Sequence, residues 1–341
     1  MDRMGIKSCL NSRLVFAVLQ LFRWVPVAFI LAVVMWSYYA YVVALCLTFM
    51  LICYHALLLV FLWSYWQTVF SKPRLPPLQF RLSSEAMLQL RHDAISQARS
   101  DLTEKILRTL PLRCRSLDGG LRVCDKCFFI KPDRSHHCSV CGTCLLKMDH
   151  HCPWVNNCVH FGNYKFFIQF LGYAWLLCLF IALTDLKHFI AFWTEENRMQ
   201  KNTQFHIMFL FFVACMFFIS VSSLLFYHLW LTSKNRTTLE AFRPPVFAHG
   251  PNKNGFNYGT LRNFQEVFGK RPLLWFLPVY TRLNAKDFLA VPVESVLMPN
   301  KNMVGLFSAV YYWVIDHIFS LGDGVTFEPT AEHVGVYLSS E

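Results

Sequence analysis

Charge is scarce in this chain of 341 residues: Asp, Glu, Lys and Arg together make up 16% of it, whereas hydrophobic residues make up 55%. Long runs contain no charged residue at all, at Trp24–Phe70, Phe166–Thr184 and Phe205–Ser233. A helix needs about 20 apolar residues to cross a bilayer. The runs therefore argue against an ordinary soluble domain and predict spans at Val25–Val43, Thr48–Trp66, Phe166–Leu183 and Phe205–Leu231. The alternative is buried helices of a large soluble core, where several uncharged runs of this length are rare.

The first run also lacks a signal-peptide boundary and a turn signal. A signal peptide ends its apolar stretch after about 7–15 residues at a small-residue cleavage site, whereas this run continues through Trp36, Tyr38 and Tyr39. Between the first two predicted spans, 44–47 contains no Gly, Pro or charge. A hairpin is poorly signalled there. One long tilted helix is the alternative, and it would invert the side of everything downstream.

Acidic residues are fewer than basic ones, 21 against 32, which gives a net charge of +11. Segment 71–165 carries fifteen Lys and Arg, while 185–204 carries three. Positive loops face the cytosol, so this bias predicts that 71–165 and both termini are cytosolic. The charge fits an anionic lipid bilayer surface or a phosphate-bearing ligand. It lies beside the spans rather than on a separate module, so we expect no nucleic-acid partner.

Cysteine and histidine gather in one segment. Seven Cys and four His fall between Cys124 and Cys158, and C-x2-C repeats place thiolates where they can share a zinc ion. In a reducing cytosol, these cysteines are expected to bind zinc rather than to form disulfides. Disulfides are the alternative, and they would require the opposite topology. Two tetrahedral sites use eight ligands, which leaves some residues for chemistry. Within Asp149-His150-His151-Cys152, a thiol, an imidazole and a carboxylate provide a nucleophile, a base and a group that orients the base.

The whole pattern resembles a known family. The run Cys124-x2-Cys127-x3-Lys131-Pro132-x-Arg134-x2-His137-Cys138-x2-Cys141-x2-Cys144-x4-Asp149-His150-His151-Cys152-Pro153-Trp154-x3-Cys158-x4-Asn163-x3-Phe167 resembles the cysteine-rich domain of the DHHC-type protein S-acyltransferases (palmitoyltransferases). Thr237-Thr238-Leu239-Glu240 resembles their TTxE motif, and Asn263–Gly269 their C-terminal aromatic-asparagine motif. The resemblance implies an all-α polytopic membrane protein with four transmembrane helices. A small cytosolic zinc-stapled cysteine-rich domain would lie between helices 2 and 3.

The resemblance also implies an activity and roles for the cluster. A long acyl chain, palmitoyl in the first place, would pass from acyl-CoA to cysteine thiols of proteins through an acyl-Cys152 intermediate, with His150 and Asp149 activating Cys152. One structural zinc would be held by Cys124, Cys127, His137 and Cys144, and a second by Cys138, Cys141, His151 and Cys158. Each set is closed, which is typical of structural zinc. Spacing alone leaves open that Cys152 is itself a ligand.

Further roles are implied around the cluster. Contacts with acyl-CoA are expected from Lys131, Arg134, His136, Trp36, Ser37, Phe167, Phe170 and Leu177. Solvated charge or helix packing is the alternative for each of them. Ser37 and Leu177 would lie near the far end of the acyl chain, where bulk sets the accepted length. Structural support is expected from Thr237, Thr238 and Asn263, and the Thr238 hydroxyl should form a hydrogen bond near Asp149.

The expected organisation follows the motifs. It comprises the N-terminus with helices 1 and 2 (1–72), a cytosolic linker (73–122), the zinc domain (123–165), helices 3 and 4 (166–231), the motif region (232–280) and a variable tail (281–341). The tail contains an insertion at about 281–319. A non-catalytic zinc-bearing adaptor and a channel are the other function classes, although the spans lack the buried charges that mark an ion path. The Golgi is the expected membrane, with the endoplasmic reticulum, endosome or plasma membrane as alternatives.

Overall fold

The computed structural model describes residues 19–44, 48–90, 96–193 and 201–280. Within these ranges, four helices are long and apolar enough to cross a membrane: α2 (Val25–Ala44), α3 (Thr48–Phe70), α6 (Tyr164–Trp193) and α7 (Lys201–Ser233). The cysteine-rich segment follows α3 and precedes α6. The predicted four-span architecture is thus confirmed. The predicted insertion at 281–319 lies outside the described residues.

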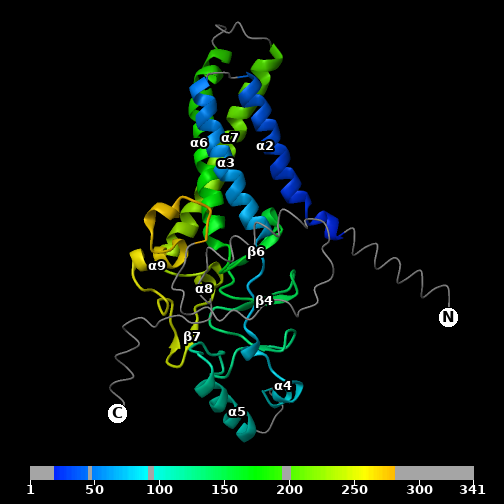
Figure 1. Ribbon diagram of the computed structural model, residues 1–341, viewed down its shortest axis with the longest axis vertical. Helices are drawn as coiled ribbons and strands as arrows, with labels where there is room; N and C mark the ends of the chain where they lie inside the picture. The colour runs from blue at the N-terminus through cyan, green and yellow to red at the C-terminus, as the bar shows by residue number, and fades with distance from the viewer. Residues whose placement is uncertain (1–18, 45–47, 91–95, 194–200, 281–341) are drawn as a thin grey trace, which may run out of the picture. The chain divides into compact units, whose positions relative to one another are not determined.

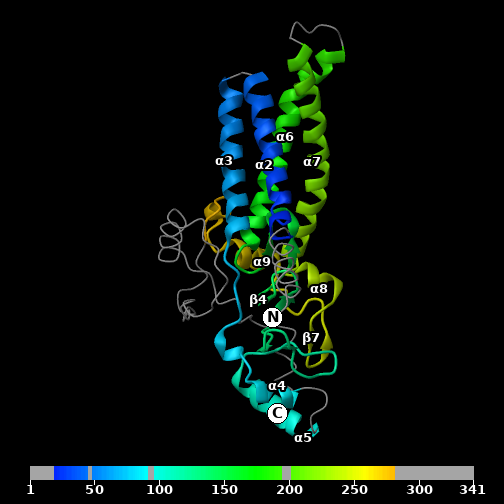
Figure 2. The ribbon, with the colours of Figure 1, turned by 90° about the vertical axis from the view of Figure 1, so that its right-hand side faces the viewer.

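The first two spans form a helical hairpin. The rings of Tyr41 and Tyr54 stack with their centroids 4.4 Å apart, and the Ser37 Oγ lies 3.4 Å from the Tyr54 hydroxyl oxygen. Figures 1 and 2 both show α2 and α3 side by side. The alternative of one long tilted helix is therefore wrong. Residues 45–47, which join the two helices, lie outside the described residues.

The last two spans are longer than predicted at both ends. Hydropathy marks only the apolar part of a helix, whereas polar residues at its ends continue the same backbone hydrogen bonds. The α6 helix begins beside Asn163, whose carbonyl oxygen accepts from the Phe167 N–H at 2.9 Å. The Trp175 Nε1 donates to the Ser222 Oγ at 2.8 Å, which joins α6 to α7. A bonded polar pair of this kind is tolerated inside a bilayer because both groups are satisfied.

Two compact units make up the chain. The first comprises the described residues of Met1–Phe70, His151–Cys158 and Gln169–Leu225, and so contains most of the four spans. The second comprises those of Ser71–His150, Val159–Ile168 and Phe226–Glu341. The cysteine-rich segment is divided between them.

Short hairpins are the only strands in the described part of the cysteine-rich segment. The pairs are β1 (Val123–Cys124) with β2 (Phe129–Ile130), β3 (His136–Cys138) with β4 (Thr143–Leu145), and β5 (His150–Cys152) with β6 (Asn157–Val159). Strands of two or three residues bury too little apolar surface to be stable alone. A frame of this kind needs bound metal or neighbouring elements to hold it.

The predicted linker supplies one such neighbour. Its described residues form η1 (Leu78–Phe80), α4 (Ser84–Leu90) and α5 (Ser96–Thr109). Phe80 and Leu112 from this region pack with Ile130 and Leu146 in one hydrophobic cluster. The linker therefore covers one side of the hairpins instead of merely connecting two domains.

The segment after α7 is tied back to the ends of the spans. It forms α8 (Thr238–Phe242), β7 (Val246–Phe247), β8 (Gly250–Pro251), α9 (Thr260–Phe268) and η3 (Pro272–Trp275). The wholly buried Asn263 donates from Nδ2 to the Ser233 carbonyl at 2.8 Å and accepts from the Tyr258 N–H at 3.0 Å. The Lys165 Nζ donates to the carbonyls of Leu274 and Val279, each at 2.8 Å.

Candidate active site

Asp149 and His150 form a bonded pair in the second unit. The Asp149 Oδ2 lies 2.7 Å from the His150 Nδ1. The Thr238 backbone N–H donates to Oδ1 at 2.9 Å, and the Thr238 hydroxyl donates to Oδ2 at 2.7 Å. The Asp149 carboxylate is wholly buried, and it has a partner on each oxygen.

These bonds decide the charge of Asp149 and the tautomer of His150. Burial alone raises the pKa of a carboxyl group, but the hydrogen bonds from His150 and Thr238 and the nearby His228 outweigh it and hold the pKa of Asp149 below its usual value. An ionised carboxylate only accepts hydrogen bonds, so Nδ1 of His150 carries the proton. Nε2 is left with a lone pair, as a general base requires.

Thr238 is held by its own helix start. Thr237 is the N-cap of α8, and its side chain accepts from the Glu240 N–H at 3.2 Å. The Glu240 carboxylate accepts in return from the Thr237 N–H at 2.9 Å. This reciprocal capping box fixes the first turn of α8, and with it both Thr238 donors. Of the predicted support residues, Thr238 therefore bonds to Asp149 directly, and Thr237 fixes the turn that carries Thr238.

Cys152 lies two residues beyond His150, at the end of β5, and belongs to the first unit. In that unit it is followed by η2 (Pro153–Val155), whose Trp154 carbonyl accepts from the Tyr65 hydroxyl at 3.0 Å. Asn157 donates from Nδ2 to the carbonyls of Thr68 and Val69, each at 3.2 Å. The loop that carries Cys152 is thus fastened to the end of α3.

The first predicted zinc set comes together in the second unit. The ligand atoms of Cys124, Cys127, His137 and Cys144 all lie within 4.8 Å of one another. His137 in β3 faces Cys144 in β4, and the Cys127 Sγ is 3.2 Å from the His137 Nδ1. Three thiols and one imidazole at this spacing fit a tetrahedral zinc ion with no open position. This donor set is typical of a structural metal site.

The second predicted set is divided between the units. Cys138 and Cys141 belong to the second unit, where the Cys141 N–H donates to the Cys138 Sγ at 3.3 Å. His151 and Cys158 belong to the first, where the Cys158 Sγ lies 3.5 Å from the His151 Nδ1. Each half has the geometry of two neighbouring ligands, and the complete second site stays a prediction.

Arg134 is wholly buried and bound within the protein. Its Nε and Nη2 donate to the two Glu240 carboxylate oxygens at 2.8 and 2.7 Å. Its Nη1 and Nη2 donate to the Asn235 side-chain and backbone oxygens, each at 2.9 Å. Burial alone raises the pKa of Glu240, but Arg134 outweighs it and holds that pKa below the usual value. This geometry favours a structural role for Arg134 over the predicted contact with acyl-CoA.

The other predicted headgroup contacts are half-buried. Lys131 follows β2, and its backbone N–H donates to the Arg122 carbonyl at 2.6 Å. Burial and the positive charges of Arg122 and Lys131 lower the pKa of His136 to about 3. His136 is therefore neutral at physiological pH and offers an anion only a hydrogen bond, whereas Lys131 offers a charge.

The predicted acyl-chain residues are also divided. Trp36, Ser37, Phe170 and Leu177 belong to the first unit, and Phe167 to the second. Phe170 packs against Tyr65 with ring centroids 5.0 Å apart. Trp36 contacts the Phe209 ring at 5.5 Å, and Ser37 lies beside Tyr54. Phe167 contacts the His150 ring at 5.4 Å.

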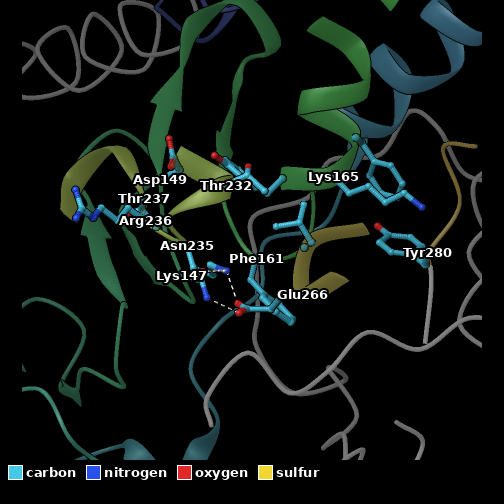
Figure 3. A pocket seen from close by; sticks show the side chains of 14 residues that line it. Lys147, Asp149, Phe161, Lys165, Thr232, Asn235, Arg236, Thr237, Glu266 and Tyr280 are labelled. Carbon is cyan, nitrogen blue, oxygen red and sulfur yellow. Dashed lines mark hydrogen bonds and ion pairs between the residues drawn. The ribbon is translucent and has the colours of Figure 1, made fainter. Parts of the chain in front are cut away.

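A pocket opens beside Asp149 within the second unit (Figure 3). Its lining includes Thr232, Thr237 and Tyr280, together with the ion pair of Lys147 and Glu266 drawn as a dashed line in Figure 3. Tyr280 is held there by edge contact with the Phe166 ring at 4.7 Å. The segment after α9 therefore forms one wall of the space next to the Asp149 carboxylate.

Sequence reasoning missed several residues of this region. Glu240 and Glu266 were noted only as parts of motifs, and His228 and Lys147 were not singled out. For Glu240 the available signal was its position in the TTxE motif. The sequence could not indicate its partner, because Arg134 lies 106 residues earlier. His228 had no local signal, because its neighbours come from other elements.

Comparison with known proteins agrees with this geometry. A family model described as DHHC palmitoyltransferase matches residues 118–244. The chain is 50% identical over 269 residues to Palmitoyltransferase ZDHHC2 of Homo sapiens, covering 76% of this chain and 73% of that protein. It is 51% identical over 273 residues to Palmitoyltransferase ZDHHC20-B of Danio rerio, covering 80% and 84%. It is 48% identical over 269 residues to Palmitoyltransferase ZDHHC15 of Rattus norvegicus, covering 76% and 80%.

Proposed function

The chain belongs to the DHHC palmitoyltransferase family, and on that premise we propose that it acylates proteins in two steps through an acyl-Cys152 intermediate. The donor is palmitoyl-CoA or another long-chain acyl-CoA, and the acceptor is a cysteine thiol of a protein at the cytosolic membrane face. The observation that carries the proposal is the bonded Asp149–His150 pair, since His150 lies two residues before Cys152.

In each step one proton moves from the attacking thiol to His150 and then to the leaving thiolate. The His150 Nε2 takes the proton of the Cys152 thiol, and the thiolate attacks the thioester carbonyl carbon. The bond to the coenzyme A sulfur breaks, and the leaving thiolate takes the proton from His150. In the second step His150 takes the proton of the substrate thiol, the acyl group moves to that sulfur, and the released Cys152 thiolate is protonated. Asp149 keeps the Nδ1–H tautomer and stabilises the imidazolium in both steps.

Two structural zinc ions complete the proposal. Cys124, Cys127, His137 and Cys144 would hold one, and Cys138, Cys141, His151 and Cys158 the other. Zinc supplies rigidity here and takes no part in the reaction, because each set is closed. A bound ion at His151 would fix the backbone between His150 and Cys152.

Polar groups would bind the coenzyme A part of the acyl donor, and apolar groups would bind its acyl chain. The Lys131 ammonium and the neutral His136 are proposed contacts for the coenzyme A phosphates. Trp36, Phe167 and Phe170 are proposed to line the acyl chain, with Ser37 and Leu177 near its end. The buried side chains of Ser37, Phe170 and Leu177 support this assignment. Arg134 is proposed to act through Glu240.

We also propose the setting. The four spans support a membrane location. The proposed membrane is that of the Golgi, and the proposed orientation has the cysteine-rich segment and both termini in the cytosol. The fifteen basic residues of 71–165 support this orientation. Cleavage by added protease in sealed Golgi vesicles should remove an epitope after residue 280 and spare one placed between α6 and α7.

The activity is tested with labelled palmitoyl-CoA and purified protein. We expect hydroxylamine-sensitive label on the wild-type chain, none in Cys152→Ser, and unchanged label in the control Cys215→Ser. An acceptor peptide with one cysteine should then remove the label, and its serine counterpart should not. Absence of label, or equal label in Cys152→Ser, would reject the mechanism.

Zinc content is measured on the same preparations. About two equivalents per chain are expected from two four-ligand sites. Cys138→Ala should lose one equivalent and Cys124→Ala the other. One equivalent or none in the wild type contradicts the ligand assignment.

A further inference from the structure

A second histidine stands beside the catalytic pair. His228 lies in α7 with 2% of its surface exposed. One side-chain ligand atom of each of Asp149, His150 and His228 lies within 4.8 Å of the others. All three residues belong to the second unit. The proposed chemistry gives His228 no task, although it is buried next to the base.

Aromatic contacts hold the two histidines and Phe167 together. The His150 ring centroid is 5.4 Å from that of Phe167 and 5.7 Å from that of His228. The third side of this triangle, Phe167 to His228, measures 5.0 Å with the rings at 82°. An imidazole bounded on two sides by rings loses freedom to rotate. On the side toward Asp149, the His150 Nδ1 lies 2.7 Å from the Asp149 Oδ2.

His228 is itself fixed by a polar contact. Its Nδ1 lies 3.1 Å from the hydroxyl of Tyr164, the first residue of α6. Tyr164 is buried, and its ring centroid is 5.8 Å from that of His228. This hydrogen bond favours one rotamer of His228, because rotation of the imidazole would remove it from the buried Tyr164 hydroxyl. Two membrane helices thus supply the wall against which His150 rests.

We propose that His228, oriented by Tyr164, is a positioning residue that holds the His150 imidazole against Asp149 for proton transfer. The inference rests on the proposed function, since it assigns His228 to the same base. His228 makes no contact with the thioester in this scheme and exchanges no proton. It acts by narrowing the orientations of His150 to those in which Nδ1 meets Asp149. Misplacement of a catalytic group by about 1 Å can reduce the rate about 100-fold.

The decisive experiment is single-turnover autoacylation of the full-length protein with labelled palmitoyl-CoA. His228→Leu should lower the rate constant about 10- to 100-fold, while the concentration of palmitoyl-CoA giving half-maximal rate and the zinc content stay at wild-type values. In the His150→Ala background, His228→Leu should cause no further loss, because its effect passes through His150. The matched control is His206→Leu, an exposed histidine of the same helix that packs on Tyr39, and it should be silent.

Two conservative substitutions distinguish a loss of positioning from misfolding. His228→Phe keeps a ring but loses the bond to Tyr164, and Tyr164→Phe loses the same bond from the other side. Each should slow the step about fivefold, as expected for one lost hydrogen bond, and the double variant should be no slower than either single one. The inference is overturned if His228→Phe matches the wild type, or if His228→Leu slows the reaction equally with and without His150. Loss of all label in wild type and Cys152→Ser alike would instead reject the proposed function.

Discussion

Replacing Arg134 by methionine is expected to destabilise the second unit and to leave acyl-CoA affinity almost unchanged. Two cations and two carboxylates meet around this residue: Arg134 and Lys147 face Glu240 and Glu266. The Arg134 side chain is wholly enclosed and that of Glu240 is 5% exposed. The four charges cancel, so removal of one cation leaves a net negative charge away from water.

The expected size follows from that burial. Removing one partner of a buried ion pair costs about 3–5 kcal/mol, because the other charge is left uncompensated. For a domain of 150–250 residues, about 1 kcal/mol shifts the melting temperature by about 2–4 °C. Arg134→Met should therefore lower the Tm by about 6–20 °C. The double variant Arg134→Met with Glu240→Gln removes one charge of each sign, and its loss should be smaller than the sum of the single losses.

Thermal unfolding in detergent, followed by size-exclusion fluorescence and by zinc release, measures this effect. The matched control is Arg243→Met, which removes an exposed arginine just after α8 and should change stability by less than about 0.5 kcal/mol. The KM for palmitoyl-CoA is measured below the melting temperature of each variant. An unchanged Tm together with a raised KM in Arg134→Met would refute the reasoning and support a phosphate contact.

Three further changes have defined outcomes. Thr238→Val removes the hydroxyl bond to Asp149 and should slow autoacylation about 10- to 100-fold, as expected for a bond to a charged group; Thr238→Ser should restore the rate, and a silent valine variant would contradict the assigned role. Ser37→Phe fills the space beside Tyr54 and should shift the preferred acyl-CoA to shorter chains in a competition assay, whereas an unaltered chain-length profile counts against Ser37 as the far end. Because the pKa of Glu240 is held below its usual 4.5, the stability that its charge contributes is present above that pH and is lost as pH falls through the lowered pKa. The Tm difference between wild type and Glu240→Gln should accordingly shrink below about pH 4.5. A difference that grows there would contradict the lowered pKa of Glu240.

The spans and the C-x2-C pairs could be predicted because their signals are local, whereas the sorting of the ligands into two zinc sets was expected only from the resemblance. An uncharged run specifies a membrane helix wherever it lies in the chain, and C-x2-C pairs bring two ligands together within one turn. The ends of α6 and α7 were missed because the apolar residues that mark a span end at the bilayer surface, whereas the helix continues through polar residues. The position of Thr238 beside Asp149 was expected only from the resemblance, since nothing in the spacing of residues 89 apart indicates contact.

The network around Arg134 could not be predicted for a different reason. A basic residue in a basic segment resembles a phosphate ligand. The adjacent acid, Asp133, accepts from the backbone N–H groups of Arg113 and Cys114, and the sequence does not indicate which other acid would pair with Arg134. The carboxylate that pairs with Arg134 comes from Glu240 in α8, 106 positions later, and becomes available only when the segment after α7 folds back. Burial then reverses the expected role, because a guanidinium enclosed by Glu240 and Asn235 exposes no N–H group to a soluble ligand.

The first turn of α8 connects the buried Arg134–Glu240 ion pair to the Asp149 carboxylate. Glu240 binds Arg134 with both oxygens and also closes the capping box with Thr237. The next residue, Thr238, donates both its backbone and side-chain hydrogens to Asp149. Any change that releases Glu240 therefore frees the turn that fixes Asp149, and it should slow autoacylation even where the protein remains folded. Glu240→Gln keeps the size of the side chain and part of its hydrogen bonding, so its rate loss should be smaller than that of Glu240→Ala at a temperature where both retain zinc. Equal rates in the two variants and the wild type would show that Asp149 is held without this turn.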